Sequence, residues 1–165
     1  DGNCSEFTPS VQAWVASLFA VIDQGLVLLI DYGYTVQEYY LVERDIGTLV
    51  CHYQHRAHAD PLWYPGLQDI TAFVDFSAVT HAAVDAGFDI SGYTSQAMFL
   101  MGCGLAELHQ SVVNDDPRQQ LLLAQQIKTL TLPSEMGERF KAMALSKEID
   151  LPLIGYAMQD YRNRL

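Results

Sequence analysis

The chain has 165 residues, of which 50% are hydrophobic and 18% are charged, a balance typical of a folded domain and not of a disordered one. Its formal net charge is −11 and it has only nine Lys and Arg residues, so we expect no nucleic-acid binding, which depends on clusters of these residues. The three cysteines form no CxxC pair, which argues against a disulfide framework and favours a reducing compartment. No uninterrupted apolar stretch reaches the length of a membrane span, so we expect no membrane-spanning helix.

The first predicted elements are a helix and a strand. After Pro9, apolar residues recur at helical spacing over residues 11–22, which predicts a helix with one buried face. Within residues 25–34, the five consecutive large aliphatic residues 26–30 end at an acid, an aromatic residue and a glycine. This run is too apolar for a strand with one solvent-exposed face, so it predicts a strand buried on both faces. A helix that leads into a buried strand indicates an α/β fold.

The middle of the chain predicts less regular structure. Residues 34–45 are polar and aromatic and predict a loop or ribbon, whereas residues 47–53 are rich in β-branched and aromatic residues and predict a strand. Residues 55–69 contain prolines and show no periodicity. A loop of this length inside a domain is typical of a lid or a substrate-binding loop.

The second half alternates helices and strands. A helix is predicted at residues 75–86, with Asp75 as its N-cap and Gly87 as its stop. The other elements are predicted in the order strand, helices, strand and tail, at residues 88–93, 96–131, 140–145 and 150–165. No repeat or linker composition divides the chain, so we expect one domain over residues 1–165.

Two acids are candidates for chemistry. Ligands of open α/β folds bind beyond the carboxyl ends of strands, where Asp31 and Tyr32 lie, although capping of the next turn would also explain Asp31. Capping accounts for Asp75 but not for Asp69, which ends the long loop. Carboxylates beside aromatic residues suit a planar cation through charge pairing and cation–π contact.

A metal site is the lesser chemical alternative. His52, His55 and His58 are spaced by three residues and lie between Cys51 and Asp60, and an irregular loop could bring them together. Neither a strand nor a helix brings all three side chains to one point, so one or two ordinary loop histidines is the competing interpretation. The sequence contains no GxSxG, GxGxxG or P-loop motif.

Five segments occur in an order that resembles one protein family: LLIDYGY, GTLVCHYQH, GLQDITAFVDFSAV, TSQAMFLMGCGL and LPSEMGERFKAMALSK. They are similar to the C-terminal half of the MidA-type S-adenosylmethionine-dependent methyltransferases, which include mitochondrial factors that assist assembly of respiratory complex I. The resemblance implies part of a class I, Rossmann-like sheet. Residues 26–30 resemble its fifth strand, 88–93 its sixth and 140–145 its antiparallel seventh strand, inserted between the other two, with a helical insertion at about 96–131.

The resemblance also implies S-adenosylmethionine as cofactor and a protein arginine as acceptor, in the bacterial cytoplasm or the mitochondrial matrix. Nothing in the chain resembles the family's glycine-rich cofactor loop, so cofactor contacts are unassigned and we expect the isolated chain to be inactive. The matching positions carried over as catalytic are Asp31, Tyr32 and Asp69, and those carried over as substrate-binding are His55, Thr71, Asp75 and Gln96. The alternative function is a cofactor-free protein-binding or assembly module.

The apolar strand at residues 26–30 requires neighbours. An exposed apolar strand edge invites pairing with other chains. We therefore expect this strand to be covered by the missing N-terminal half, by another chain or by a swapped element.

Overall fold

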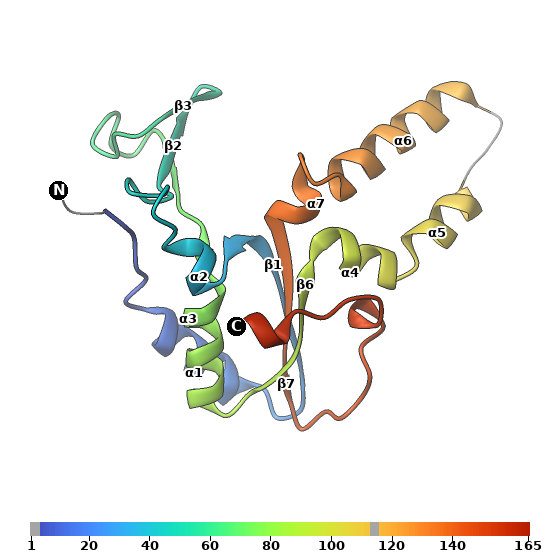
Figure 1. The fold of residues 1–165 in the computed structure, drawn as a ribbon, viewed down its shortest axis with the longest axis horizontal. Coiled ribbons are helices and arrows are strands. Elements are labelled where there is room, and N and C mark those ends of the chain that lie inside the picture. Colours follow the sequence, from blue (N-terminus) through green and yellow to red (C-terminus); the bar gives the residue numbers. More distant parts are fainter. Residues whose placement is uncertain (1–3, 113–115) are drawn as a thin grey trace.

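The centre of the computed structural model is a four-stranded sheet (Figure 1), and the structure describes residues 4–112 and 116–165. The strands are β1 (Gly25–Tyr34), β5 (Val74–Asp75), β6 (Asp89–Ser95) and β7 (Phe140–Lys147). Their order is β5-β1-β7-β6, with β7 antiparallel to both β1 and β6 and β5 parallel to β1. Because β1 and β6 therefore run in the same direction, their carboxyl ends lie at the same end of the sheet.

Two helices, α1 (Val11–Val21) and α3 (Phe76–Ala86), pack together on one face of this sheet and enclose the core. The predicted signals for α3 are confirmed. Asp75 caps it by accepting the Ala78 N–H at 3.0 Å, and Gly87 ends it with a φ of +103°, a conformation that favours glycine.

The prediction that both faces of residues 26–30 are buried is wrong for the described structure. Val27 and Leu29 pack against the core, whereas Leu26, Leu28 and Ile30 are 41%, 42% and 44% exposed on the other face. Within the described residues, β1 pairs with β5 only at its last two positions, so residues 25–32 are unpaired on the side away from β7. Coverage of this strand from outside the chain stays a prediction.

A second sheet has three strands in the order β3-β2-β4 and forms a lobe beyond the short helix α2 (Figure 1). Its strands are β2 (Val50–Tyr53), β3 (Arg56–His58) and β4 (Asp69–Thr71), so the predicted long loop contains a strand. Helix α2 (Val36–Tyr39) replaces part of the loop predicted for 34–45, because Thr35 and Glu38 form a capping box. The strand predicted at 47–53 begins only at Val50, since Thr48 and Leu49 bind Glu6 instead.

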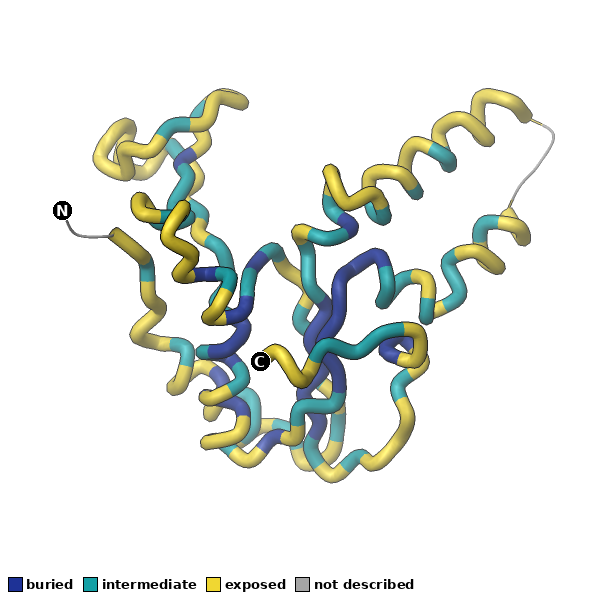
Figure 2. The backbone as a smooth tube through the Cα atoms, viewed as in Figure 1, coloured by how far each residue is buried: buried dark blue, intermediate teal, exposed yellow. Residues whose placement is uncertain are grey.

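Four helices follow β6, which runs two residues beyond its predicted end: α4 (Gln96–Gly102), α5 (Leu105–Val112), α6 (Pro117–Thr131) and α7 (Met136–Arg139). The chain turns between α4 and α5 at Gly104, whose φ is +89°. Helices α5 and α6 project away from the sheet and contain no buried residue among those described (Figure 2). No helix in the described part of the chain combines the length and hydropathy needed to cross a bilayer.

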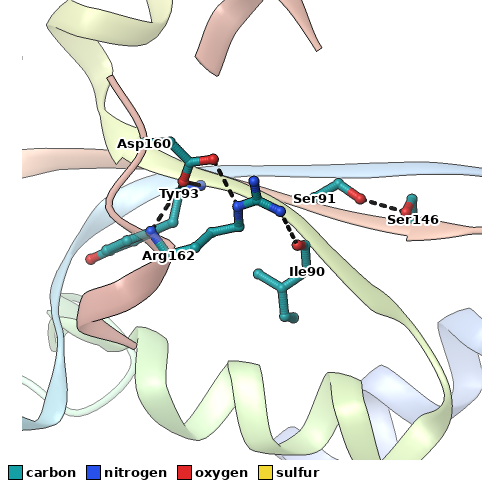
Figure 3. Close-up of polar contacts among 6 residues, drawn as sticks. All are labelled: Ile90, Ser91, Tyr93, Ser146, Asp160 and Arg162. Carbon is teal, nitrogen blue, oxygen red and sulfur yellow. Dashed lines mark hydrogen bonds and ion pairs between the residues drawn. The ribbon is translucent and has the colours of Figure 1, made fainter. Parts of the chain in front are cut away.

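The C-terminal tail, for which the sequence shows no clear pattern, binds the outer edge of β6 (Figure 3). The Asp160 carboxylate accepts the Tyr93 N–H at 3.3 Å and pairs with Arg162 Nε at 2.7 Å, and Arg162 Nη1 donates to the Ile90 carbonyl at 3.0 Å. Two short 3₁₀ turns belong to this tail, η1 (Ile154–Tyr156) and η2 (Arg162–Arg164). The tail therefore closes one side of the sheet, whereas the β1 side stays open.

Candidate functional site

Polar side chains meet at the carboxyl ends of β1 and β6. Strand β7 places Lys141 opposite Asp31 on one side and opposite Ser95 on the other, so the three side chains share one face of the sheet. Asp31 is exposed and accepts the Tyr32 N–H at 2.8 Å, while the Lys141 ammonium donates to the Glu138 carbonyl. Among the described residues the Asp31 carboxylate makes no ion pair, so its charge is available to a ligand.

An aromatic wall lies at the same end of the sheet but on its other face, because Tyr32 and Phe140 alternate with Asp31 and Lys141 along the paired strands. The Tyr32 ring contacts Phe73 and Phe140 edge to face, with centroids 5.0 and 5.4 Å apart, and Tyr34 stacks on Phe73 at 5.1 Å. The Arg44 guanidinium lies over the Tyr34 ring, 3.7 Å from its centroid. The aromatic wall therefore already makes a cation–π contact with one planar cation, the guanidinium of Arg44.

Three consecutive hydroxyl side chains at the end of β6 were not among the predicted site residues. Tyr93, Thr94 and Ser95 are 2%, 0% and 0% exposed, and their hydroxyl oxygens have no hydrogen-bond partner in the described structure. Burial, with a further contribution from the negative charge of Glu38, raises the pKa of the Tyr93 phenol, which keeps it a donor. The signal was present in the sequence as three adjacent polar residues that end a strand.

Three of the predicted substrate-binding residues bond within the fold. Thr71 donates to the Val50 carbonyl at 3.2 Å, and Asp75 caps α3. Gln96 is buried and donates through Nε2 to the Leu130 carbonyl at 2.9 Å, which ties α4 to the end of α6. These contacts explain the three residue types without a ligand.

The other predicted residues are divided between the two sheets. Asp31 and Tyr32 lie on β1, whereas Asp69 lies on β4 opposite His52, and His55 occupies the turn between β2 and β3 with a φ of +64°. Asp69 and His55 are exposed. In the part of the chain that the structure describes, no contact brings Asp31 and Asp69 together.

The metal alternative is not supported within residues 4–112 and 116–165, where no three His, Cys, Asp or Glu side chains converge as a metal site. Pairing of β2 with β3 puts Cys51 opposite His58, so these two point to one face and His52 points to the other. His58 Nδ1 instead accepts the Asp60 N–H at 3.3 Å.

A cavity of about 930 Å³ opens where the end of β1 meets the three-stranded sheet, and Glu6, Tyr34, Arg44 and His58 help to line it. Burial raises the pKa of the Glu6 carboxyl, but hydrogen bonds from the Thr48 and Leu49 N–H groups and the Thr48 hydroxyl outweigh it, and the pKa lies below its usual range. Glu6 and Arg44 are not predicted by the sequence, because neither belongs to a recognisable motif.

No described loop forms a glycine-rich cradle for a nucleotide-like cofactor. Gly33, at the end of β1, is needed for packing: a Cβ atom there would collide with the Val74 carbonyl and the Phe76 ring. The described loops therefore offer no such cradle of backbone N–H groups at the end of β1.

Comparisons with known proteins agree with the architecture. A family model described as "Putative S-adenosyl-L-methionine-dependent methyltransferase" matches residues 1–94. The chain is 34% identical over 143 residues to the Drosophila melanogaster "Protein arginine methyltransferase NDUFAF7 homolog, mitochondrial", which is 82% of this chain and 31% of that protein. It is also 34% identical over 124 residues to the Rattus norvegicus "Protein arginine methyltransferase NDUFAF7, mitochondrial", which is 73% of this chain and 26% of that protein.

One structural match is with a Burkholderia thailandensis protein crystallised with S-adenosyl-homocysteine. Its TM-score is 0.96 at 43% sequence identity, over 100% of this chain and 43% of that one. A native crystal structure from the same organism also gives a TM-score of 0.96, over 44% of its chain. The chain thus spans less than half the length of each of these relatives. The family model and the 34% identity to the Drosophila protein over 82% of this chain confirm the resemblance. The chain belongs to this family of S-adenosyl-L-methionine-dependent methyltransferases.

Proposed function

We propose that this chain forms the acceptor-binding side of an S-adenosylmethionine-dependent methyltransferase domain whose acceptor is a protein arginine. The observation that carries the proposal is the order of strands in the sheet, in which antiparallel β7 lies between β1 and β6. Strands β1 and β6 both end beside polar side chains. We assign β1, β6 and β7 to the fifth, sixth and seventh strands of a class I, Rossmann-like sheet. Residues 1–165 are then one partial domain with a helical insertion at 96–131.

The arginine acceptor is supported by chemistry at the end of β1. A guanidinium group is planar and always charged, binds carboxylates through paired hydrogen bonds and stacks on aromatic rings. Asp31 offers an exposed carboxylate, and Tyr32 belongs to an aromatic wall that already holds the Arg44 guanidinium. We assign Asp31 and Tyr32 to binding and orienting the acceptor, and orientation is a large part of catalysis in group transfer.

Asp69 and His55 are assigned to contacts with the acceptor protein, because both are exposed on the lobe that stands beyond the end of β1. Thr71, Asp75 and Gln96 are left out of the proposal, since their polar atoms are already bonded within the fold. The names of the relatives support a mitochondrial location in a eukaryote, which we assign to the matrix, and we assign a bacterial form to the cytoplasm.

The cofactor is assigned mainly to residues outside this chain. The neighbour crystallised with S-adenosyl-homocysteine has more than twice as much chain, of which this sequence covers 43%. We propose that the same additional region pairs with the open side of β1 at residues 25–32 and covers Leu26, Leu28 and Ile30. The apolar character of these three side chains suits an added helix or strand layer.

Isothermal titration calorimetry with S-adenosylmethionine tests the cofactor assignment. The 165-residue chain is expected to show no binding, because its described loops form no glycine-rich cradle, and micromolar binding would contradict the assignment.

The acceptor assignment is tested in the intact, longer protein by mass spectrometry of the methylated product. Asp31→Ala and Asp69→Ala are each expected to slow methylation about tenfold or more, the effect of losing a hydrogen bond to a charged group. Asp89→Ala is the matched control, since Asp89 is exposed at the opposite end of the sheet. Methylation at the wild-type rate by the Asp31 and Asp69 variants would refute the assignment.

The cofactor-free binding module has one observation in its favour, the exposed apolar residues Leu108, Leu121 and Leu122 on the projecting helices α5 and α6. Methyl transfer by the intact protein decides between the two functions, because a binding module transfers no methyl group.

A further inference from the structure

The cavity at the end of β1 has the size and lining of a small-ligand site. Its volume of about 930 Å³ is within the usual range for ligand pockets, roughly 300–1,000 Å³. The lining is mostly apolar, with Ile46, Val50 and Phe73 among the contributing side chains. The proposed methyl transfer uses Asp31 and Tyr32, neither of which lines this cavity.

Two side chains that line the cavity each leave a nitrogen without a hydrogen-bond partner. Arg44 Nη1 and His58 Nε2 are shielded from solvent and make no hydrogen bond in the described structure. Because His58 Nδ1 accepts the Asp60 N–H at 3.3 Å, the neutral imidazole carries its proton on Nε2, which is therefore a donor. Buried donors that neither water nor protein satisfies are costly, and a ligand acceptor would remove that cost once a change of side-chain rotamer exposes the two nitrogens to the cavity.

The arginine is held in place before any ligand arrives. Its guanidinium lies over the Tyr34 ring at 3.7 Å, and that ring stacks on Phe73 with centroids 5.1 Å apart. Phe73 is fixed in turn by a hydrogen bond from its N–H to the Thr48 hydroxyl at 3.0 Å. A guanidinium that is already oriented loses little conformational freedom when it binds a ligand.

The acid that lines the same cavity does not neutralise this arginine. Both oxygens of Glu6 accept hydrogen bonds from the Thr48 N–H, and further bonds come from the Leu49 N–H and the Thr48 hydroxyl, all at 3.0 Å. Among the described residues Glu6 and Arg44 form no ion pair. The positive charge of Arg44 therefore remains available.

We propose that this cavity binds a carboxylate carried on an apolar or aromatic body, with Arg44 and His58 donating to the carboxylate and the lining residues contacting the body. Two sources supply this chemistry: a small organic acid, or an acidic side chain next to an aromatic one in a peptide. The site shares Tyr34, Phe73 and Arg44 with the aromatic wall, but it contains none of the proposed acceptor contacts Asp31, Tyr32, His55 and Asp69.

Calorimetric titration with benzoate and with its uncharged analogue benzamide tests the site. Benzoate is expected to bind at least about tenfold more tightly than benzamide, and Arg44→Gln should remove that preference. The matched control is Arg56→Gln, because Arg56 is exposed on β3 and does not line the cavity. A capped Phe-Asp peptide, compared with Phe-Asn, identifies the source: tighter binding than benzoate assigns a peptide, and weaker binding assigns a small acid.

Alkylation of cysteines by iodoacetamide gives a second measurement on the same samples. Cys4 is exposed and lines the cavity, whereas Cys103 is exposed and lies outside it. Bound benzoate should slow alkylation of Cys4 and leave that of Cys103 unchanged. Equal binding of benzoate and benzamide overturns the proposal, as does wild-type benzoate binding by an Arg44→Gln variant whose thermal unfolding matches that of the wild type.

Discussion

Replacing Gly92 by alanine tests whether the C-terminal tail is an integral part of the sheet. A Cβ atom at Gly92 would penetrate the Tyr156 ring, which is only 7% exposed. Overpacking of this kind costs about 1–3 kcal/mol if the surroundings shift. If Tyr156 leaves its site instead, the loss of its burial costs about 2–3 kcal/mol. We expect Gly92→Ala to lower the free energy of unfolding by about 2–3 kcal/mol.

A double-mutant cycle in urea, followed by circular dichroism, isolates the contact. Tyr156→Ala alone should cost about 3 kcal/mol, as for other buried aromatic residues. The double variant should cost little more than Tyr156→Ala alone, because the ring with which the new methyl group collides is gone. The coupling energy is then about 2 kcal/mol. Additive effects of the two substitutions would refute the packing of Tyr156 on β6.

Three further predictions concern single side chains. Asp75→Ala should destabilise α3 by about 1 kcal/mol in thermal unfolding, whereas Asp75→Asn, which keeps a capping oxygen, should cost much less; equal losses would contradict the cap. Because the pKa of Glu6 is lowered in the folded protein, its carboxylate contributes to stability above pH 4.5, the ordinary value, and this contribution is lost as the pH falls through the folded pKa. The free energy of unfolding of Glu6→Gln should therefore depend less on pH below 4.5 than that of the wild type. Lys147→Met removes the ammonium that donates to the Phe19 carbonyl in α1 at 2.9 Å and to the Ile22 carbonyl just after it at 2.6 Å, and it should cost about 1–2 kcal/mol in urea. Lys128→Met on the projecting helix α6 should cost less than about 0.5 kcal/mol.

Local signals predicted several elements correctly. Asp75 and Gly87 mark the ends of α3 because capping and left-handed stops depend on residues within one turn. Asp116 and Pro117 stand at the start of α6, where an N-cap acid and a first-turn proline are favoured by contacts within the same turn. The position of β7 between β1 and β6 agrees with what the family resemblance implied, although no local pattern in residues 140–147 could reveal its partners.

Long-range contacts account for the errors. The tail after residue 150 shows no regular hydrophobic period, and the role of Asp160 becomes visible only once its carboxylate lies against the N–H of Tyr93. Likewise, Arg44 and His58 are separated in the sequence by the first strand of the small sheet, and only the folding of that sheet brings them to one cavity.

By itself, the sequence determined the family, the α/β class and the presence of a strongly apolar strand at residues 26–30, because these depend on motifs, periodicity and composition. Only the tertiary structure decided which sides of that strand are used. Pairing with β7 covers one edge of β1, and packing of Val27 and Leu29 against the core covers one of its faces. The tail covers the far edge of the sheet at β6. The remaining edge and face, with Leu26, Leu28 and Ile30, are left open because pairing and coverage are properties of neighbours and not of the strand.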